Sequence, residues 1–137
     1  MVSFPAPNMN NVRLGRLISN LADSVEGEPG FWHFHYQRRR IMAITDEEQN
    51  RMRLITPILP ESELSDSIRE ILLSANFDRA LDAKYAVSRG MLWSVFLHPL
   101  RELTDGQFVD AVEQVHQLAE NFGTTYSSSD LRFEREI

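Results

Sequence analysis

Five arginines lie close together between residues 38 and 53, next to a run of aromatic residues. They are Arg38, Arg39, Arg40, Arg51 and Arg53. In the preceding segment 31–36, Trp32, Phe34 and Tyr36 alternate with other residues and would share one face of a strand. Guanidinium groups beside aromatic rings are typical of proteins that bind single-stranded nucleic acid. The spacing therefore makes a single-stranded RNA-binding module, using this arginine-rich hairpin, one hypothesis for the chain.

The overall charge opposes that hypothesis. The 137-residue chain has 20 acidic and 14 basic residues and a formal net charge of −6, whereas phosphate binding relies on a positive field. No RNP-type motif accompanies the aromatic residues. Arginines along a strand can also serve only to stop a sheet edge from pairing with another chain. Nucleic acid is therefore the less favoured partner.

Metal binding and catalysis have weaker signals still. His33 and His35 would project from one face of a strand, a spacing that can place two imidazoles on one metal ion. No third ligand stands near them in the sequence, and the acidic run 46–48 lacks the glycines and spacing of a calcium loop. We predict no metal, no cofactor and no catalytic residues, because the chain has no cysteine and no recognisable catalytic or phosphate-binding motif. An enzyme or small-ligand binder with a dispersed site remains a third hypothesis.

Length and composition indicate a single domain. A chain of 137 residues can bury a substantial core without disulfides. The absence of cysteine permits a reducing cytoplasm. No targeting segment and no stretch of about 18 apolar residues occurs, so we expect a cytoplasmic protein without a membrane partner. We predict a flexible N-terminal arm over 1–10, one α+β domain over 11–130 and a charged C-terminal tail over 131–137.

Hydrophobic periodicity predicts the order α-β-β-β-α-β-β-α, with helices packed on a twisted antiparallel sheet. The first helix would run from Asn11 to Val25 and end at Gly27. A second helix would begin at Ser65, and a third would carry a capping box formed by Thr104 and Gln107. The predicted strands cover residues 31–36, 41–45, 51–58, 81–87 and 91–97.

The last predicted strand is apolar on both faces. We take Met91, Trp93, Val95 and Leu97 as its core face, with Trp93 as a structural residue. The opposite face carries Leu92, Ser94 and Phe96, which is too apolar for a sheet face in water. We therefore predict that these three residues form a dimer or partner interface. The alternative is that the first helix covers them within the same chain.

Several runs of sequence resemble the YbjN-type family of bacterial proteins, and most of all its cyanobacterial-like branch. They are Leu54-Ile55-Thr56-Pro57-Ile58, Asn76-Phe77-Asp78-Arg79-Ala80-Leu81, Leu92-Trp93 and His98-Pro99-Leu100. The resemblance implies a fold like that of type III secretion chaperones, in which two subunits usually dimerise. Our first hypothesis is therefore a non-enzymatic homodimer that binds an unidentified protein, as a chaperone-like adaptor or regulator.

Overall fold

The computed structural model describes residues 8–129, which contain three α-helices, one short 3-10 helix and six strands. In chain order these are α1 (Asn11–Leu21), β1 (Ser24–Glu28), β2 (Phe31–Tyr36), β3 (Arg39–Asp46), β4 (Arg51–Pro60), η1 (Glu61–Glu63), α2 (Asp66–Asp78), β5 (Lys84–Ser88), β6 (Met91–His98) and α3 (Asp105–Glu120). The predicted α+β class with an antiparallel sheet is confirmed.

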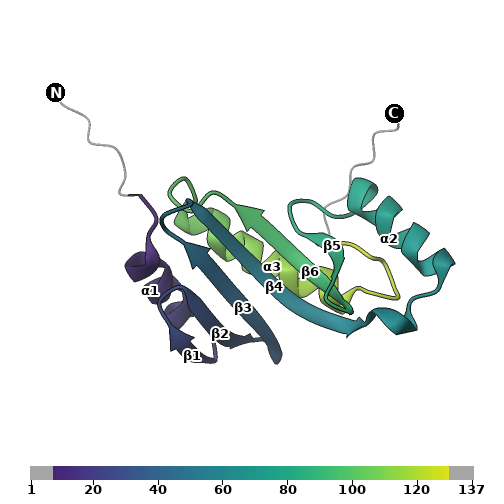
Figure 1. Cartoon of the computed structure of the whole chain (residues 1–137), viewed down its shortest axis with the longest axis horizontal. Coiled ribbons are helices and arrows are strands. Elements are labelled where there is room, and N and C mark those ends of the chain that lie inside the picture. Colours follow the sequence, from purple (N-terminus) through teal and green to yellow (C-terminus); the bar gives the residue numbers. More distant parts are fainter. Residues whose placement is uncertain (1–7, 130–137) are drawn as a thin grey trace.

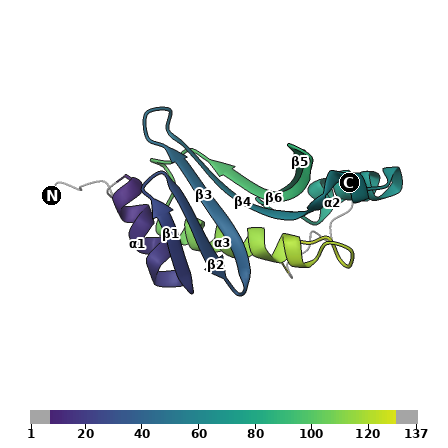
Figure 2. The same ribbon diagram turned by 60° about the horizontal axis from the view of Figure 1, so that its bottom comes forward.

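All six strands belong to one antiparallel sheet with the order β1-β2-β3-β4-β6-β5. Helices α1 and α3 lie on one face of this sheet, whereas α2 lies beside the edge strand β5 (Figure 1). The turned view in Figure 2 shows α3 running under the sheet, with no described helix over the opposite side of β3, β4 and β6. The hydrophobic core therefore lies between one face of the sheet and α1 and α3.

The beginning of the fold departs from prediction at β1. Helix α1 ends at Leu21, and residues 24–28 pair with β2 instead of continuing the helix to Val25. Gly27 lies within this strand at φ +103°, where a Cβ atom would stand 2.3 Å from the carbonyl oxygen of Phe31. The expected helix end at Gly27 was therefore wrong, because the glycine serves a tight hairpin and the sheet gains one strand.

The N-terminal prediction also needs correction. Met9 is buried in the core, and its backbone N–H donates to the carbonyl oxygen of Arg101 at 3.2 Å. Residues 8–10 are therefore part of the packed structure, and Asn10 caps α1 by accepting a hydrogen bond from the N–H of Arg13. The rest of the predicted arm and the predicted tail, 131–137, lie outside the described residues. Within 8–129, none of the helices has the length and apolar character needed to cross a bilayer.

The caps of the other helices are as predicted. Ser65 accepts from the N–H of Ile68 at 3.2 Å and begins α2. The capping box of α3 is complete: Gln107 N–H donates to Thr104 Oγ1 at 3.1 Å, and Thr104 N–H donates to Gln107 Oε1 at 2.9 Å. These local bonds fix where α3 begins and so which of its side chains reach the sheet.

Candidate functional site

Strand β6 has its two faces the other way round from the prediction. Leu92, Ser94 and Phe96 point toward α3 and are buried within the chain. Trp93 and Leu97 lie on the opposite face, which no described helix covers. The prediction of an interface on Leu92, Ser94 and Phe96 was therefore wrong, and so was the prediction that Trp93 lies in the core. These residues are covered within the chain, by α3 at Ser94 and with α2 beside Leu92, and not by the first helix as the alternative proposed.

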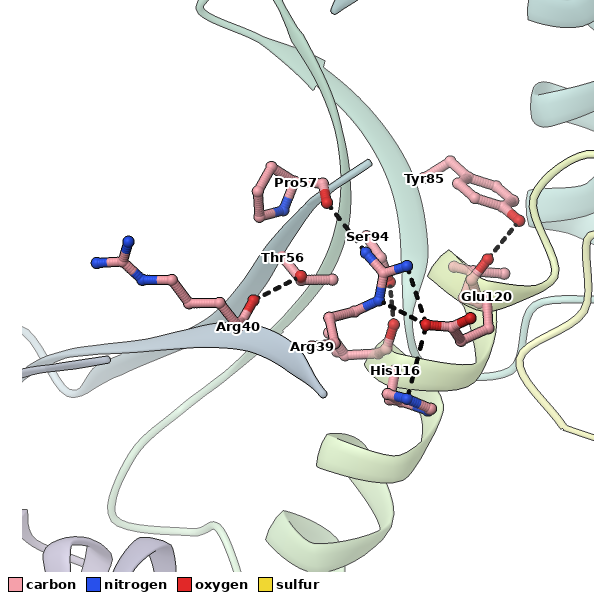
Figure 3. Close-up of polar contacts among 10 residues, drawn as sticks. Arg39, Arg40, Thr56, Pro57, Tyr85, Ser94, His116 and Glu120 are labelled. Carbon is pink, nitrogen blue, oxygen red and sulfur yellow. Dashed lines mark hydrogen bonds and ion pairs between the residues drawn. The ribbon is translucent and has the colours of Figure 1, made fainter. Parts of the chain in front are cut away.

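Hydrogen bonds to α3 explain why a polar side chain occupies the core face. The Ser94 hydroxyl donates to the carbonyl oxygen of Val115 at 2.9 Å, and the Tyr85 hydroxyl donates to that of Leu118 at 2.7 Å (Figure 3). Thr56, directly opposite Ser94 on β4, donates to the carbonyl oxygen of Arg40 at 2.7 Å. A buried hydroxyl with a partner costs little, so Ser94 does not mark a solvent-facing surface.

The face of the sheet opposite the helices is a broad surface of partly exposed side chains, which we call the open face. Its apolar members on the central strands are Met42, Ile44, Ile55, Pro57, Trp93, Val95 and Leu97. Directly paired residues form rows across the sheet, among them Met42, Ile55 and Val95, and then Pro57 and Trp93. Leu97 retains 57% of its accessible surface. A continuous partly exposed apolar surface of this kind is typical of a protein-binding site.

Three of the five predicted arginines belong to the open face. Arg40 points away from α3, and Arg51 and Arg53 alternate with buried residues of β4. Arg39 points the other way, where it pairs with Glu120 of α3 at 3.0 Å and donates to the carbonyl oxygen of Pro57 at 3.2 Å (Figure 3). The fifth, Arg38, lies in the β2–β3 turn. The sequence cluster is thus divided between two faces and a turn.

The aromatic residues that would have completed an RNA-binding platform are on the helix side. Trp32 and Phe34 are buried, and the Trp32 indole lies against Gly15 of α1. The ring of Tyr36 packs edge-on against His116 of α3. Stacking with bases requires exposed rings on the same surface as the basic groups. The fold separates the two sets, which removes the observation that favoured RNA.

The predicted histidine pair is engaged in protein contacts. His33 Nδ1 accepts from the guanidinium group of Arg40 at 2.6 Å, and His35 Nδ1 lies 3.1 Å from Ser24 Oγ. Across residues 8–129 there is no cluster of three or more His, Cys, Asp or Glu side chains able to hold a metal ion. In the acidic loop, Asp46 accepts from the N–H of Gln49 at 2.9 Å. Each of these side chains therefore has a hydrogen-bond partner within the described part of the chain.

A second apolar surface, which the sequence analysis missed, surrounds α2. We call it the α2 patch: Leu73 and Phe77 on the helix, with Val87 on β5. Leu73 and Phe77 keep 71% and 74% of their accessible surface, and a groove of about 320 Å³ separates the helix from β5. The signal was present in the sequence, because residues 73 and 77 share a helix face that the stripe of Leu72 and Ala75 does not use.

The α2 patch is an exposed surface of side chains and not an open sheet edge. The side chain of Asn76 donates to the carbonyl oxygen of Tyr85 at 3.0 Å and accepts from its N–H at 2.8 Å. An amide side chain thus occupies the backbone groups that an added strand would use. At Tyr85 the β5 edge is therefore closed to an added strand.

Two solved structures share this architecture of an antiparallel sheet with helices on one face. A chain in the crystal structure of the ExsC–ExsE complex aligns with a TM-score of 0.60 and 16% identity, covering 82% of this chain and 92% of that one. A chain in the HopA1–SchA chaperone–effector complex aligns with a TM-score of 0.59 and 12% identity, covering 82% and 94%.

Comparison of sequences does not assign the chain to a family. No protein-family model matches the chain, and no curated protein matches it. Membership of the YbjN-type family therefore stays a prediction, whereas the chaperone-like fold is supported by both structural comparisons.

Proposed function

We propose that the protein is a non-enzymatic, chaperone-like module that binds a segment of another protein, as an adaptor or regulator in the cytoplasm. The observation that carries this proposal is the open face. Its rows of Met42, Ile55 and Val95 and of Pro57 and Trp93 cross the central strands without a covering layer in the described chain. A sheet in an α+β protein usually has one face packed and the other polar, so an apolar second face favours an occupant.

The structural neighbours support the same direction. One is part of a chaperone–effector complex, in which a protein of this fold is bound to another protein. The open face offers the chemistry for such binding, because burying apolar area contributes about 25 cal/mol per Å². No comparable argument supports an enzyme: the side chains on the open face are mostly aliphatic or are arginines.

The homodimer forms through the α2 patch in this proposal. Leu73 and Phe77 are exposed on one side of α2. Two copies of α2 packed antiparallel around a two-fold axis would bring these two residues of each copy against those of the other. The helix dipoles would also be antiparallel. This arrangement leaves both open faces accessible.

Site-specific photo-crosslinking in the source cells tests the protein-binding role. A photoreactive residue at Val95 should capture a different polypeptide, identified by mass spectrometry, because Val95 lies in the middle of an open-face row. The same residue at Val109, which is exposed on α3, is the matched control. Capture at Val95 only of nucleic acid, or of nothing beyond the control, contradicts the proposal.

A further inference from the structure

We propose that the occupant of the open face is an amphipathic helix of the partner protein, with an apolar stripe bordered by Asp and Glu. This inference rests on the proposed protein-binding function and specifies the class of segment bound. It follows from three properties of the open face: the direction of its hydrogen-bonding groups, the shape of its apolar area and the sign of its charge.

Hydrogen bonding selects a helix. The backbone N–H and C=O groups of β3, β4 and β6 are paired with one another in the plane of the sheet. A segment lying on top of the sheet therefore receives no backbone bonds from it, and a segment buried there must satisfy its own. A helix does this internally, whereas an extended chain does not. Strand addition belongs to the sheet edges β1 and β5 and not to this face, and β5 is already occupied at Tyr85 by the side chain of Asn76.

The apolar area has the size for a short helix. The apolar area extends over three rows of paired residues. The first contains Ile44, Arg53 and Leu97, the second Met42, Ile55 and Val95, and the third Pro57 and Trp93. Alternate residues along a strand are about 7 Å apart, so three rows span about 14 Å. That length corresponds to about ten residues of α-helix, or three anchoring turns with the i, i+3, i+4, i+7 spacing of helix-in-groove recognition.

The charge of the open face selects acidic flanks. Arg40, Arg51 and Arg53 border the apolar rows on β3 and β4, where Asp46 is the one carboxylate on this face. Glu26 and Glu28 stand on the same face at the far β1 edge, beyond β2. None of the three arginines makes an ion pair within 4.0 Å to a carboxylate of residues 8–129. Guanidinium groups at the rim of an apolar surface favour partners with carboxylates at matching positions.

The same charges disfavour the other occupants. A second copy docked face to face would bring two sets of arginines together, which opposes association. Single-stranded RNA could pair its phosphates with the arginines. However, the exposed ring of Phe31 and the partly exposed ring of Trp93 stand on β2 and β6, with two strands between them. The Trp93 indole N–H also donates to the carbonyl oxygen of Ser88 at 2.9 Å. The surface between the rings is aliphatic, which suits a helix and not a series of stacked bases.

A peptide selection tests the proposal with the full-length protein. The library consists of helical peptides of about 15 residues with a fixed leucine stripe and flanking positions randomised among Asp, Glu, Lys, Arg and Ser. We expect selection to enrich Asp and Glu beside the stripe. Enrichment of Lys and Arg, or equal recovery of all charges, would overturn the inference. So would enrichment of proline-containing, non-helical peptides from a second library without the fixed stripe.

Variants then locate the binding. For the best acidic peptide, Arg53→Glu and Leu97→Asp should each weaken binding at least about tenfold, and affinity should fall with added salt. Both positions are exposed, so far-ultraviolet circular dichroism should be unchanged. Val109→Asp on α3 is the matched control and should bind like the native protein. Equal binding of the peptide by all three variants refutes a helix site on the open face. So does a result in which the protein binds single-stranded oligouridine more tightly than the peptide and Arg53→Glu abolishes that oligouridine binding.

The two proposals can fail separately. If Val95 crosslinks a cellular protein but the selected peptides are not acidic, protein binding stands and the acidic-helix inference is wrong. If acidic peptides are selected and Leu97→Asp abolishes their binding, but no cellular protein is crosslinked, the open face does prefer acidic helices. The proposed protein-binding role in the cell is then wrong.

Discussion

Two leucines on β6 give a matched test of which face of the sheet is covered. Leu92 has 0% of its surface exposed on the helix side of the sheet, where it lines the groove beside α2, whereas Leu97 has 57% exposed on the open face. The two residues lie on the same strand and are of the same type, so strand propensity and side-chain size are controlled. Leu92→Ala and Leu97→Ala therefore differ chiefly in burial.

The magnitudes follow from that difference. Truncating a fully buried leucine removes its transfer free energy and leaves a cavity, which costs about 2–5 kcal/mol. We expect about 3 kcal/mol for Leu92→Ala. Leu97 keeps more than half of its surface in water, so Leu97→Ala should cost less than about 1 kcal/mol. With a urea m-value of about 2 kcal/mol/M, the two midpoints should be separated by at least about 1 M.

Urea denaturation followed by tryptophan fluorescence and circular dichroism measures both variants. Coincident transitions with the two probes would establish that unfolding is two-state. If Leu97→Ala destabilises the isolated protein as much as Leu92→Ala at every protein concentration, another part of the chain covers the open face and the structural argument fails. A cost below about 1 kcal/mol for Leu92→Ala would refute its placement in the core.

Three further predictions follow from individual contacts. Phe77→Asp should convert a dimer to a folded monomer in analytical ultracentrifugation, because it places a carboxylate in the α2 patch. The control Val109→Asp should leave the dimer intact. A native protein that is monomeric at high concentration would contradict the proposed dimer. Gln114→Ala should cost about 2–4 kcal/mol in urea denaturation, since the buried side-chain oxygen of Gln114 accepts two backbone N–H groups at 2.8 and 3.1 Å just before β5; a cost below about 1 kcal/mol would show that water replaces it. Burial raises the pKa of the Tyr85 phenol above its ordinary value of 10.0, so the folded state retains a proton that the unfolded state loses, and stability should fall as the pH rises above about 10. Tyr85→Phe should reduce that slope, and an unchanged slope would show that Tyr85 does not cause it.

Local sequence patterns determined the elements whose stabilising bonds are themselves local. The capping box of Thr104 and Gln107 and the cap at Ser65 join residues three apart, so both helix starts could be predicted. The β5–β6 turn at Arg89 and Gly90, both at positive φ, is a local element of the same kind. The antiparallel α+β class followed from these elements and their short connections.

The predictions that failed depend on contacts between residues distant in the chain. Val25 continued the helical spacing of α1, but pairing with Phe34 of β2 places it in a strand. The five arginines are neighbours in sequence, but strand alternation and the Arg39–Glu120 pair divide them between two faces.

The two faces of β6 show most clearly where the sequence stopped being decisive. Both faces are apolar, so alternation alone determined that β6 is a strand but could not determine which side is inside. That choice was made by α3, whose Val115 carbonyl oxygen accepts from Ser94, 21 residues earlier in the chain. Once its hydroxyl has that partner, Ser94 can be buried without a large cost, and Trp93 and Leu97 are left on the open face. The sequence alone could thus predict that a second face needs a covering layer, whereas only the tertiary structure decided which face it is.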